Sequence, residues 1–357
     1  MDIFLLFVLY LLSHSVIIAY AQINPALSSL HFEGGSISAD GASRICSVLP
    51  ALSTAESSIR AVPRIRKLDF SHNDIGDAGA EPCAELIRAS TWMQELRLAN
   101  CELSHQGVAS LISALRDSSC IEILDLGQNS DIGLDGHVAI GAFLACDSSL
   151  QTLHLDYTGI CIDGFKAVCD GLKVNRSLQE IVLEPMEPDG AVNLLADALR
   201  ENSSLRRLHL SYSSIDEHSI EVLSAALRVN SGLELLDLDF NRIGDRGAIS
   251  LGEALRVNTG LRTLILSECG IDDTGAVALG MALSRNSSLT CLKLNNNSIG
   301  DAGALSLGEA LRANSAMITL DLECNQIGPL GAEFIRKAQL ANSRLEPISL
   351  KFNRCDK

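Results

Sequence analysis

The chain has 357 residues, a formal net charge of −16 and only 4% aromatic residues. Because a phosphate backbone is bound by clustered lysine and arginine, and the sequence has no run of either, this charge argues against nucleic acid as a partner. The low aromatic content argues against a large stacking pocket, so no small-molecule substrate is expected. A partner protein with a basic face is the better match to an acidic chain.

The first expected element is an apolar leader over residues 1–21. Apolar residues run from Ile3 to Leu12, and Ala19-Tyr20-Ala21 has the small-x-small form of a signal-peptide cleavage site. Three interpretations stay open: a cleaved secretory signal, an uncleaved membrane anchor, or an artefactual start. Contact with a membrane is expected only for the anchor.

Cysteine usage points to a different compartment from the leader. Eleven cysteines follow the leader, an odd number, with no Cys-x-x-Cys pair. That pattern is typical of a reduced cytoplasmic protein, whereas a genuine leader implies the secretory pathway. The localisation therefore stays open between the two.

A 28-residue repeat organises the rest of the chain. Residues 22–64 are predicted to hold a degenerate first copy, opening at Leu27, and an inserted loop. Ten repeats are predicted over residues 65–344, and a partial C-terminal capping repeat over 345–357. The repeat starts are Ile65, Met93, Ile121, Leu150, Leu178, Leu205, Leu233, Leu261, Leu289 and Met317, followed by Leu345.

The copy that starts at Leu289 shows the parts of the repeat most clearly. Leu292-x-Leu294 alternates, as in a short strand with one buried face. Asn297 follows at a turn, where its amide can bond open backbone groups. Apolar residues at helical spacing then predict a short helix. Neither element is stable alone, so the copies are expected to stack into an α/β solenoid of about eleven repeats, a horseshoe with an inner parallel sheet and outer helices.

Repeats such as LDLDFNRIGDRGAISLGEALRVNTG resemble the leucine-rich repeats of ribonuclease inhibitor and of NOD-like receptors, from about Leu27 to the C-terminus. The resemblance implies a curved sheet that grips protein partners. The array is also similar in length to Ran GTPase-activating protein, although the chain ends in RCDK without an acidic tail.

One repeat departs from the pattern. After Leu183 the sequence reads EPMEPDG, which lacks the turn asparagine and contains Pro185 and Pro188. Because proline cannot donate to a strand ladder, a kink or an open loop is expected there. This departure either shapes a binding site or is tolerated drift.

No pattern for chemistry occurs in the sequence. Gly-x-Ser-x-Gly, phosphate-loop, His-Glu-x-x-His and dinucleotide patterns are absent. We therefore predict no catalytic residue, no cofactor, no metal site and no enzymatic activity. His154 and His209 occupy equivalent positions two repeats apart and are interpreted as exposed, and the cysteines as packing residues. Four glycosylation sequons begin at Asn175, Asn202, Asn286 and Asn296, and they matter only for a secreted chain.

Two sequence columns are expected to face the concave side of the sheet: the residue between the paired leucines, and the residue two positions after the second leucine. Tyr157, Tyr212 and Phe240 all fall in the second column. Aromatic residues with an acidic surround are typical of a protein-binding hot spot, although strands also tolerate aromatics. The predicted partner-binding residues are Asp125, His154, Asp156, Tyr157, His209, Tyr212, Asp237, Asp239, Phe240 and Glu268.

These observations favour a non-enzymatic interaction module or scaffold that binds a protein on its concave face. Two alternatives remain. The first is a regulator of a small GTPase, which the resemblance to Ran GTPase-activating protein implies. The second is a secreted recognition or adhesion protein, which the leader favours.

Overall fold

The computed structural model describes residues 27–54, 64–146, 149–186 and 190–356. It divides into two compact units, which we call unit 1 (up to Val182) and unit 2 (from Leu183) and describe separately. The division falls at the repeat that breaks the sequence pattern. The expected leader, residues 55–63 of the expected inserted loop, and Pro188 lie outside the described residues.

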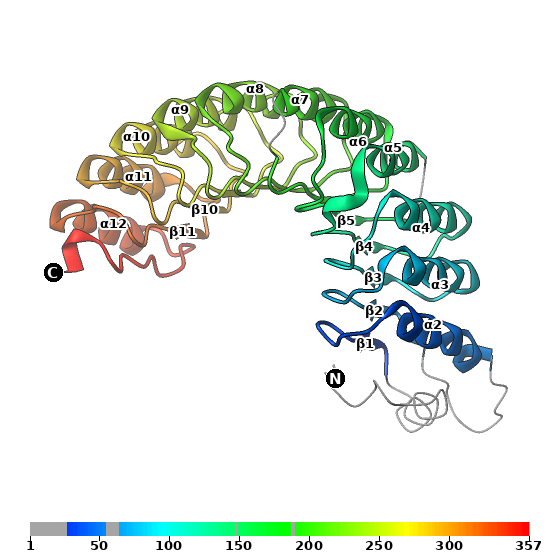
Figure 1. The fold of residues 1–357 in the computed structure, drawn as a ribbon. Helices are drawn as coiled ribbons and strands as arrows, with labels where there is room; N and C mark the ends of the chain where they lie inside the picture. Colours follow the sequence, from blue (N-terminus) through cyan, green and yellow to red (C-terminus); the bar gives the residue numbers. More distant parts are fainter. Residues whose placement is uncertain (1–26, 55–63, 147–148, 187–189, 357) are drawn as a thin grey trace. The chain divides into compact units, whose positions relative to one another are not determined.

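Unit 1 alternates three-residue strands with helices, and its strands pair in parallel in chain order (Figure 1). Its strands are β1 (Ser29–His31), β2 (Lys67–Asp69), β3 (Glu95–Arg97), β4 (Ile123–Asp125), β5 (Thr152–His154) and β6 (Glu180–Val182). Its helices are α2 (Ala39–Thr54), α3 (Gly76–Ala89), α4 (His105–Asp117), the 3-10 turn η2 (Ser130–Ile132), α5 (Gly133–Leu144) and α6 (Ile162–Val174).

Unit 2 repeats the same alternation, and its strands also pair in parallel in chain order. Its strands are β7 (Arg207–His209), β8 (Leu235–Asp237), β9 (Thr263–Ile265), β10 (Cys291–Lys293) and β11 (Thr319–Asp321). Its helices are α7 (Ala191–Glu201), α8 (Glu217–Leu227), α9 (Gly244–Leu255), α10 (Asp273–Leu283), α11 (Asp301–Ala313), α12 (Pro329–Ala341) and the 3-10 turn η3 (Arg354–Asp356).

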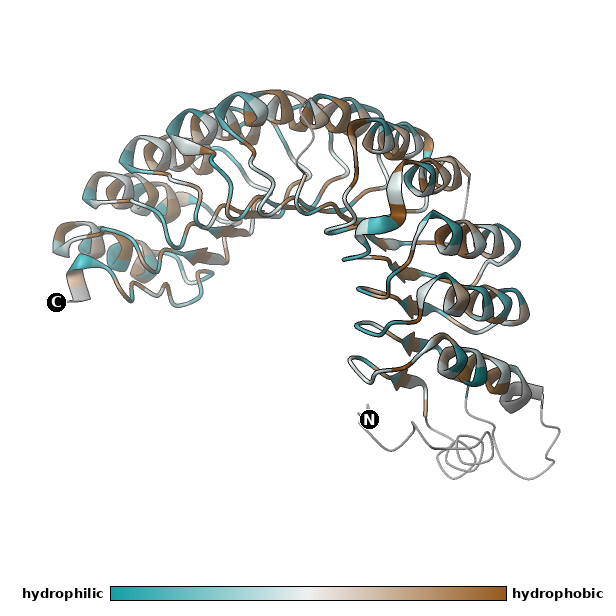
Figure 2. Cartoon of the chain, viewed as in Figure 1, coloured by the Kyte–Doolittle hydropathy of each residue, from teal (hydrophilic) through white to brown (hydrophobic). Residues whose placement is uncertain are grey.

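The strand register confirms the 28-residue repeat. Leu68 lies opposite Leu96 in β2 and β3, and Leu292 lies opposite Leu320 in β10 and β11. These central leucines are buried, as are the second leucines of the pairs. In each unit the apolar side chains of strands and helices therefore form a layer between sheet and helices. In Figure 2, hydrophobic residues, coloured brown, occur along both the strands and the helices.

The predicted asparagine turn joins neighbouring repeats as expected. The Asn241 amide donates to the carbonyls of Leu210 and Leu238 at 2.9 Å each, and its oxygen accepts from Ser213 N at 3.1 Å and Ile215 N at 2.9 Å. The buried amide therefore satisfies backbone groups of two repeats at once. In another repeat Cys101 takes the position of this asparagine, and its thiol donates to the Phe70 carbonyl at 3.1 Å.

Glycines on helices α9, α10 and α11 of unit 2 let the next helix approach closely. A Cβ atom on Gly308 would lie 3.0 Å from the Phe334 backbone, and one on Gly280 would lie 2.9 Å from the Ser306 backbone. This explains why the repeat keeps a residue that destabilises a helix interior by about 1 kcal/mol. Among the described residues, no helix combines the length and apolar character needed to cross a bilayer.

Candidate partner-binding surface

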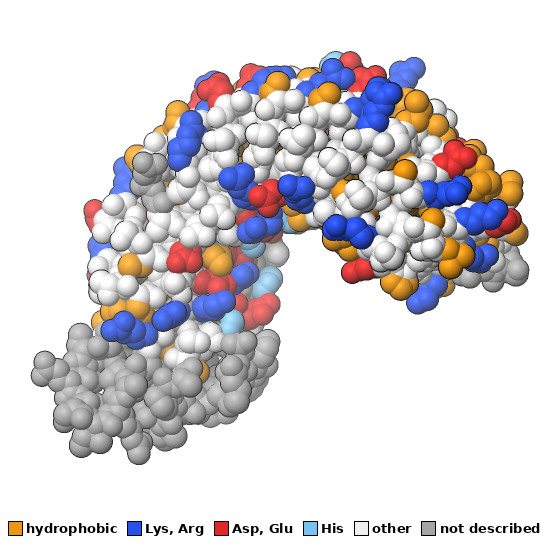
Figure 3. All heavy atoms as spheres, turned by 180° about the vertical axis from the view of Figure 1, so that it is seen from behind, with side chains coloured by type: hydrophobic (Ala, Val, Ile, Leu, Met, Phe, Trp, Pro, Cys, Tyr) orange, Lys and Arg blue, Asp and Glu red, His pale blue; other side chains and the backbone are white. Residues whose placement is uncertain are grey.

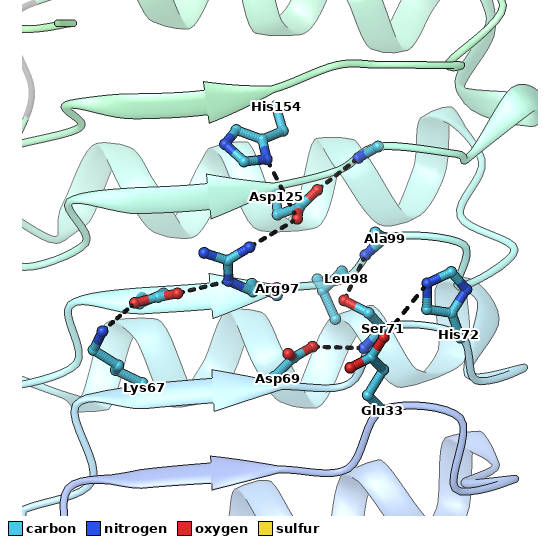
Figure 4. Close-up of polar contacts among 12 residues, drawn as sticks. Glu33, Lys67, Asp69, Ser71, His72, Arg97, Leu98, Ala99, Asp125 and His154 are labelled. Carbon is cyan, nitrogen blue, oxygen red and sulfur yellow. Dashed lines mark hydrogen bonds and ion pairs between the residues drawn. The ribbon is translucent and has the colours of Figure 1, made fainter. Parts of the chain in front are cut away.

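The face of each sheet that points away from the helices, which we call the open face, carries a row of charged side chains in unit 1 (Figure 4). Lys67 Nζ lies 3.0 Å from Glu95 Oε2, and Arg97 Nε lies 2.6 Å from Glu95 Oε1. Arg97 Nη1 and His154 Nδ1 each lie 3.5 Å from Asp125 Oδ2. Figure 3 shows such acidic, basic and histidine side chains gathered on the sheet side of unit 1.

Two carboxylates in this row have pKa values shifted in opposite directions. Burial raises the pKa of Asp125, but the hydrogen bond and charge of His154, with help from Gly127 N–H and Arg97, outweigh it and leave the pKa lowered. For Asp156, burial and the charge on Asp125 raise the pKa. The structure thus brings Asp125, His154 and Asp156 together on one face, with exposed Tyr157 immediately after them.

Unit 2 repeats this arrangement around β7 and β8. His209 Nδ1 lies 3.5 Å from Asp237 Oδ2. Burial raises the pKa of Asp237, but the His209 hydrogen bond, with bonds from Asp239 N–H and Ser211, leaves the pKa lowered. Burial and the charge on Asp237 raise the pKa of both Asp239 and Glu184. This open face therefore holds negative charge that is poorly solvated.

The second sequence column does not lie in the strands, contrary to the sequence-based expectation. Each strand is three residues long, and Tyr212 and Phe240 follow it in a left-handed turn with φ of 53° and 56°. Their N–H groups donate to Asp239 O at 3.1 Å and Ser267 O at 2.9 Å in the next repeat. The turn keeps the side chains exposed, at an unfavourable backbone angle for residues other than glycine or asparagine.

Two aromatic side chains of this column contact each other. The rings of Tyr212 and Phe240 stack with centroids 4.3 Å apart and planes 10° from parallel. Both side chains nevertheless stay exposed, at 51% and 44%. Glu268, the next residue of the column, is also exposed and has φ of 55°. Of the predicted residues in unit 2, the structure therefore brings together an apolar pair with a carboxylate beside it.

Two sets of side chains among the described residues offer a histidine nitrogen and two carboxylate oxygens within 4.8 Å of one another. They are Asp125, His154 and Asp156 in unit 1, and Glu184, His209 and Asp237 in unit 2. These atoms are of the kinds that ligate zinc, but acidic faces commonly hold such groups without a metal. The interpretation of His154 and His209 as exposed is wrong: 22% and 23% of their side chains are exposed, because each packs against an aspartate.

Three of the four sequon asparagines hold the solenoid together. Asn175 and Asn286 are buried, and their Nδ2 atoms donate to the carbonyls of Leu144 at 2.8 Å and Leu255 at 2.7 Å. Asn202 is also buried, whereas Asn296 is exposed. The three sequons thus reflect a structural asparagine at the helix-to-strand junction of the repeat.

Comparison with known proteins agrees with this geometry. The model of the leucine-rich-repeat family matches residues 65–82, 229–252, 257–280, 285–308 and 313–335. The chain is also 32% identical to ribonuclease inhibitor from Sus scrofa over 170 residues, which cover 46% of this chain and 36% of that protein. The chain therefore carries leucine-rich repeats, and the array is similar to that of ribonuclease inhibitor.

The chain is also similar to NACHT, LRR and PYD domains-containing protein 12 from Mus musculus. The two are 33% identical over 129 residues, which cover 36% of this chain and 12% of that protein. The chain thus spans about a third of the inhibitor and about an eighth of this second relative. A chain from the yeast Rad7 and Elc1 complex has the same fold, with 16% identity, a TM-score of 0.56, and coverage of 88% of this chain and 73% of that one.

Proposed function

We propose that this chain is a protein-binding module, and that the stacked Tyr212–Phe240 pair on the open face of unit 2 anchors its partner. The observation that carries the proposal is the exposure of two contacting rings, at 51% and 44%, on a surface held rigid by the repeat. Clustered, exposed aromatic side chains are the residues that most often dominate the energy of protein interfaces.

The backbone of this pair supports a role in binding. Both residues adopt left-handed angles that asparagine or glycine would adopt at lower cost, and asparagine does stand at the equivalent Asn100 and Asn296. The aromatic side chains are therefore not needed to form the turn. A binding role accounts for large apolar groups at a position where they add backbone strain.

The carboxylates around the pair favour a partner with lysine or arginine side chains. Burial raises the pKa of Asp239 and Glu184, so their charged forms lack full solvation. A partner cation would restore favourable interactions for both groups, and arginine could also stack on an aromatic ring. We expect the affinity to fall as salt concentration rises.

Unit 1 offers a contact of its own. Tyr157 is 53% exposed in the equivalent left-handed turn, after the set formed by Asp125, His154 and Asp156. We assign it a supporting role because no other described aromatic ring stacks on the Tyr157 ring, in contrast to the Tyr212–Phe240 pair.

Relatives support the class of function without naming the partner. The name of ribonuclease inhibitor states that it acts on another protein, and the yeast structure is of a complex of two proteins. We extend to this chain the binding role alone, without catalysis.

The test begins with identification of a partner by crosslinking and mass spectrometry, followed by calorimetry with the purified partner. The double variant Tyr212→Ala/Phe240→Ala should lose at least about 30-fold in affinity, as expected for a hot spot. Phe352→Ala is the matched control, because Phe352 occupies the same turn column and is 75% exposed. A folded double variant with unchanged affinity would refute the anchor, and Tyr157→Ala then tests the unit 1 contact separately.

A further inference from the structure

Two cysteines far apart in sequence meet between the first two described helices of unit 1. Cys46 lies on α2 and Cys83 on α3, and their Sγ atoms are 3.7 Å apart. Both side chains are buried, with 3% and 0% exposure. The sequence predicts cysteines that act as packing residues, and the structure adds that these two thiols contact each other.

We propose that Cys46 and Cys83 form a disulfide that links the first repeat covalently to the second. The two sulfur atoms face each other across one helix interface, and a disulfide requires them to approach to about 2.05 Å. Helix α2 belongs to the first described repeat, whose strand β1 pairs with β2. The bond would therefore join these two repeats covalently across their helix interface.

The link would close a large loop. It spans the chain from Cys46 to Cys83, including the insertion that separates the first repeat from the regular array. Closing a loop of this length removes much conformational freedom from the unfolded chain, which stabilises the folded state. The disulfide would therefore hold the first repeat in place despite the insertion.

The bond should form during folding and not in the folded protein. The hydrogen bond to Cys46 and burial raise the pKa of Cys83 well above the ordinary value, and burial also blocks access. In the unfolded chain, one thiolate attacks glutathione disulfide, forms a mixed disulfide and releases one glutathione. The second thiolate then attacks the protein-bound sulfur, closes the bond and releases the second glutathione. The two thiol protons pass to the two released glutathione thiolates.

The first experiment maps the bond. The full chain is refolded with glutathione disulfide, alkylated under denaturing conditions and digested for mass spectrometry. We expect a Cys46–Cys83 peptide, a mass lower by two hydrogen atoms, and two fewer alkylated sites than the eleven of the reduced chain. Free Cys46 and Cys83 thiols, or a Cys83–Cys101 bond instead, would overturn the proposal. Oxidation of the already folded chain should be much slower.

The second experiment measures what the bond does. Trp92, the single tryptophan, lies in unit 1, so its fluorescence reports unfolding of that unit. The oxidised chain should unfold roughly 5–10 °C higher than the reduced chain. Cys101→Ser should keep this difference and Cys46→Ala should abolish it. Equal midpoints for the mapped, oxidised wild type and its reduced form would overturn the stabilising role, and the peptide map remains decisive if a variant fails to fold.

Discussion

Replacing Phe240 with asparagine separates the cost of the turn from the benefit of the ring. The change removes a ring stacked at 4.3 Å on Tyr212, which costs about 0.5–1.5 kcal/mol of stability. It also places asparagine, which tolerates left-handed backbone angles, at a φ of 56°, and this should increase the free energy of unfolding by about 1 kcal/mol. The two effects oppose each other, so the free energy of unfolding should change by less than about 1 kcal/mol.

Binding should respond very differently. If the ring is part of a hot spot, its loss should make the binding free energy less favourable by about 2 kcal/mol or more. This corresponds to a dissociation constant roughly 30-fold higher. The assay pairs denaturant unfolding with calorimetry for Phe240→Asn and Phe352→Asn. The control at Phe352 has φ of 58° and should leave affinity unchanged. Equal losses of affinity in both variants, or a loss explained by unfolding, would refute the reasoning.

Three further predictions follow from buried polar groups. Burial lowers the pKa of His137 by more than the hydrogen bond with the Gly133 carbonyl raises it. The contribution of His137 to the free energy of unfolding is therefore complete above about pH 6.5, and it is lost as the pH falls through the lowered pKa. Trp92 fluorescence in urea at several pH values should show that loss in wild type and a weaker one in His137→Gln. Asn241→Ala orphans backbone groups in two repeats and should cost about 2–4 kcal/mol in denaturant titration. The exposed Asn296→Ala should cost only about 1 kcal/mol, from alanine at a left-handed φ of 57°. Glycopeptide mapping after secretory expression should find a glycan at Asn296 and at none of the three buried sequons, whose occupancy in folded protein would contradict the structure.

The fold was predictable because the repeat encodes it redundantly. The paired leucines, the turn asparagine and the apolar helix stripe recur in nearly every copy, so one degenerate copy hardly weakens the pattern. A glycine on the helix fits this design as well, since Gly308 allows the close approach of α12. The division at Leu183 falls at the repeat whose sequence, with Pro185, departs from the pattern and predicts a kink or an open loop.

The sequence columns predicted which residues belong to the site, but they did not predict the backbone conformation of those residues. The alternation of a strand places side chains on faces, but it does not indicate where a strand ends, so the left-handed turn at Tyr212 and Phe240 was missed. The enclosure of His154 by Asp125 was missed as well, because it depends on the neighbouring repeat. The contact between Cys46 and Cys83 likewise arises from stacking, and no spacing within one repeat signals it.

Hydroxyl-radical footprinting of the complex tests the central claim most directly. Tyr212 and Phe240 are accessible to oxidation in the free chain, and so is Met281, which is 62% exposed on helix α10. Our account predicts that partner binding slows oxidation of the aromatic pair several-fold and leaves Met281 unchanged. Protection of Met281 with unchanged oxidation of the pair would place the partner on the helices and contradict the account.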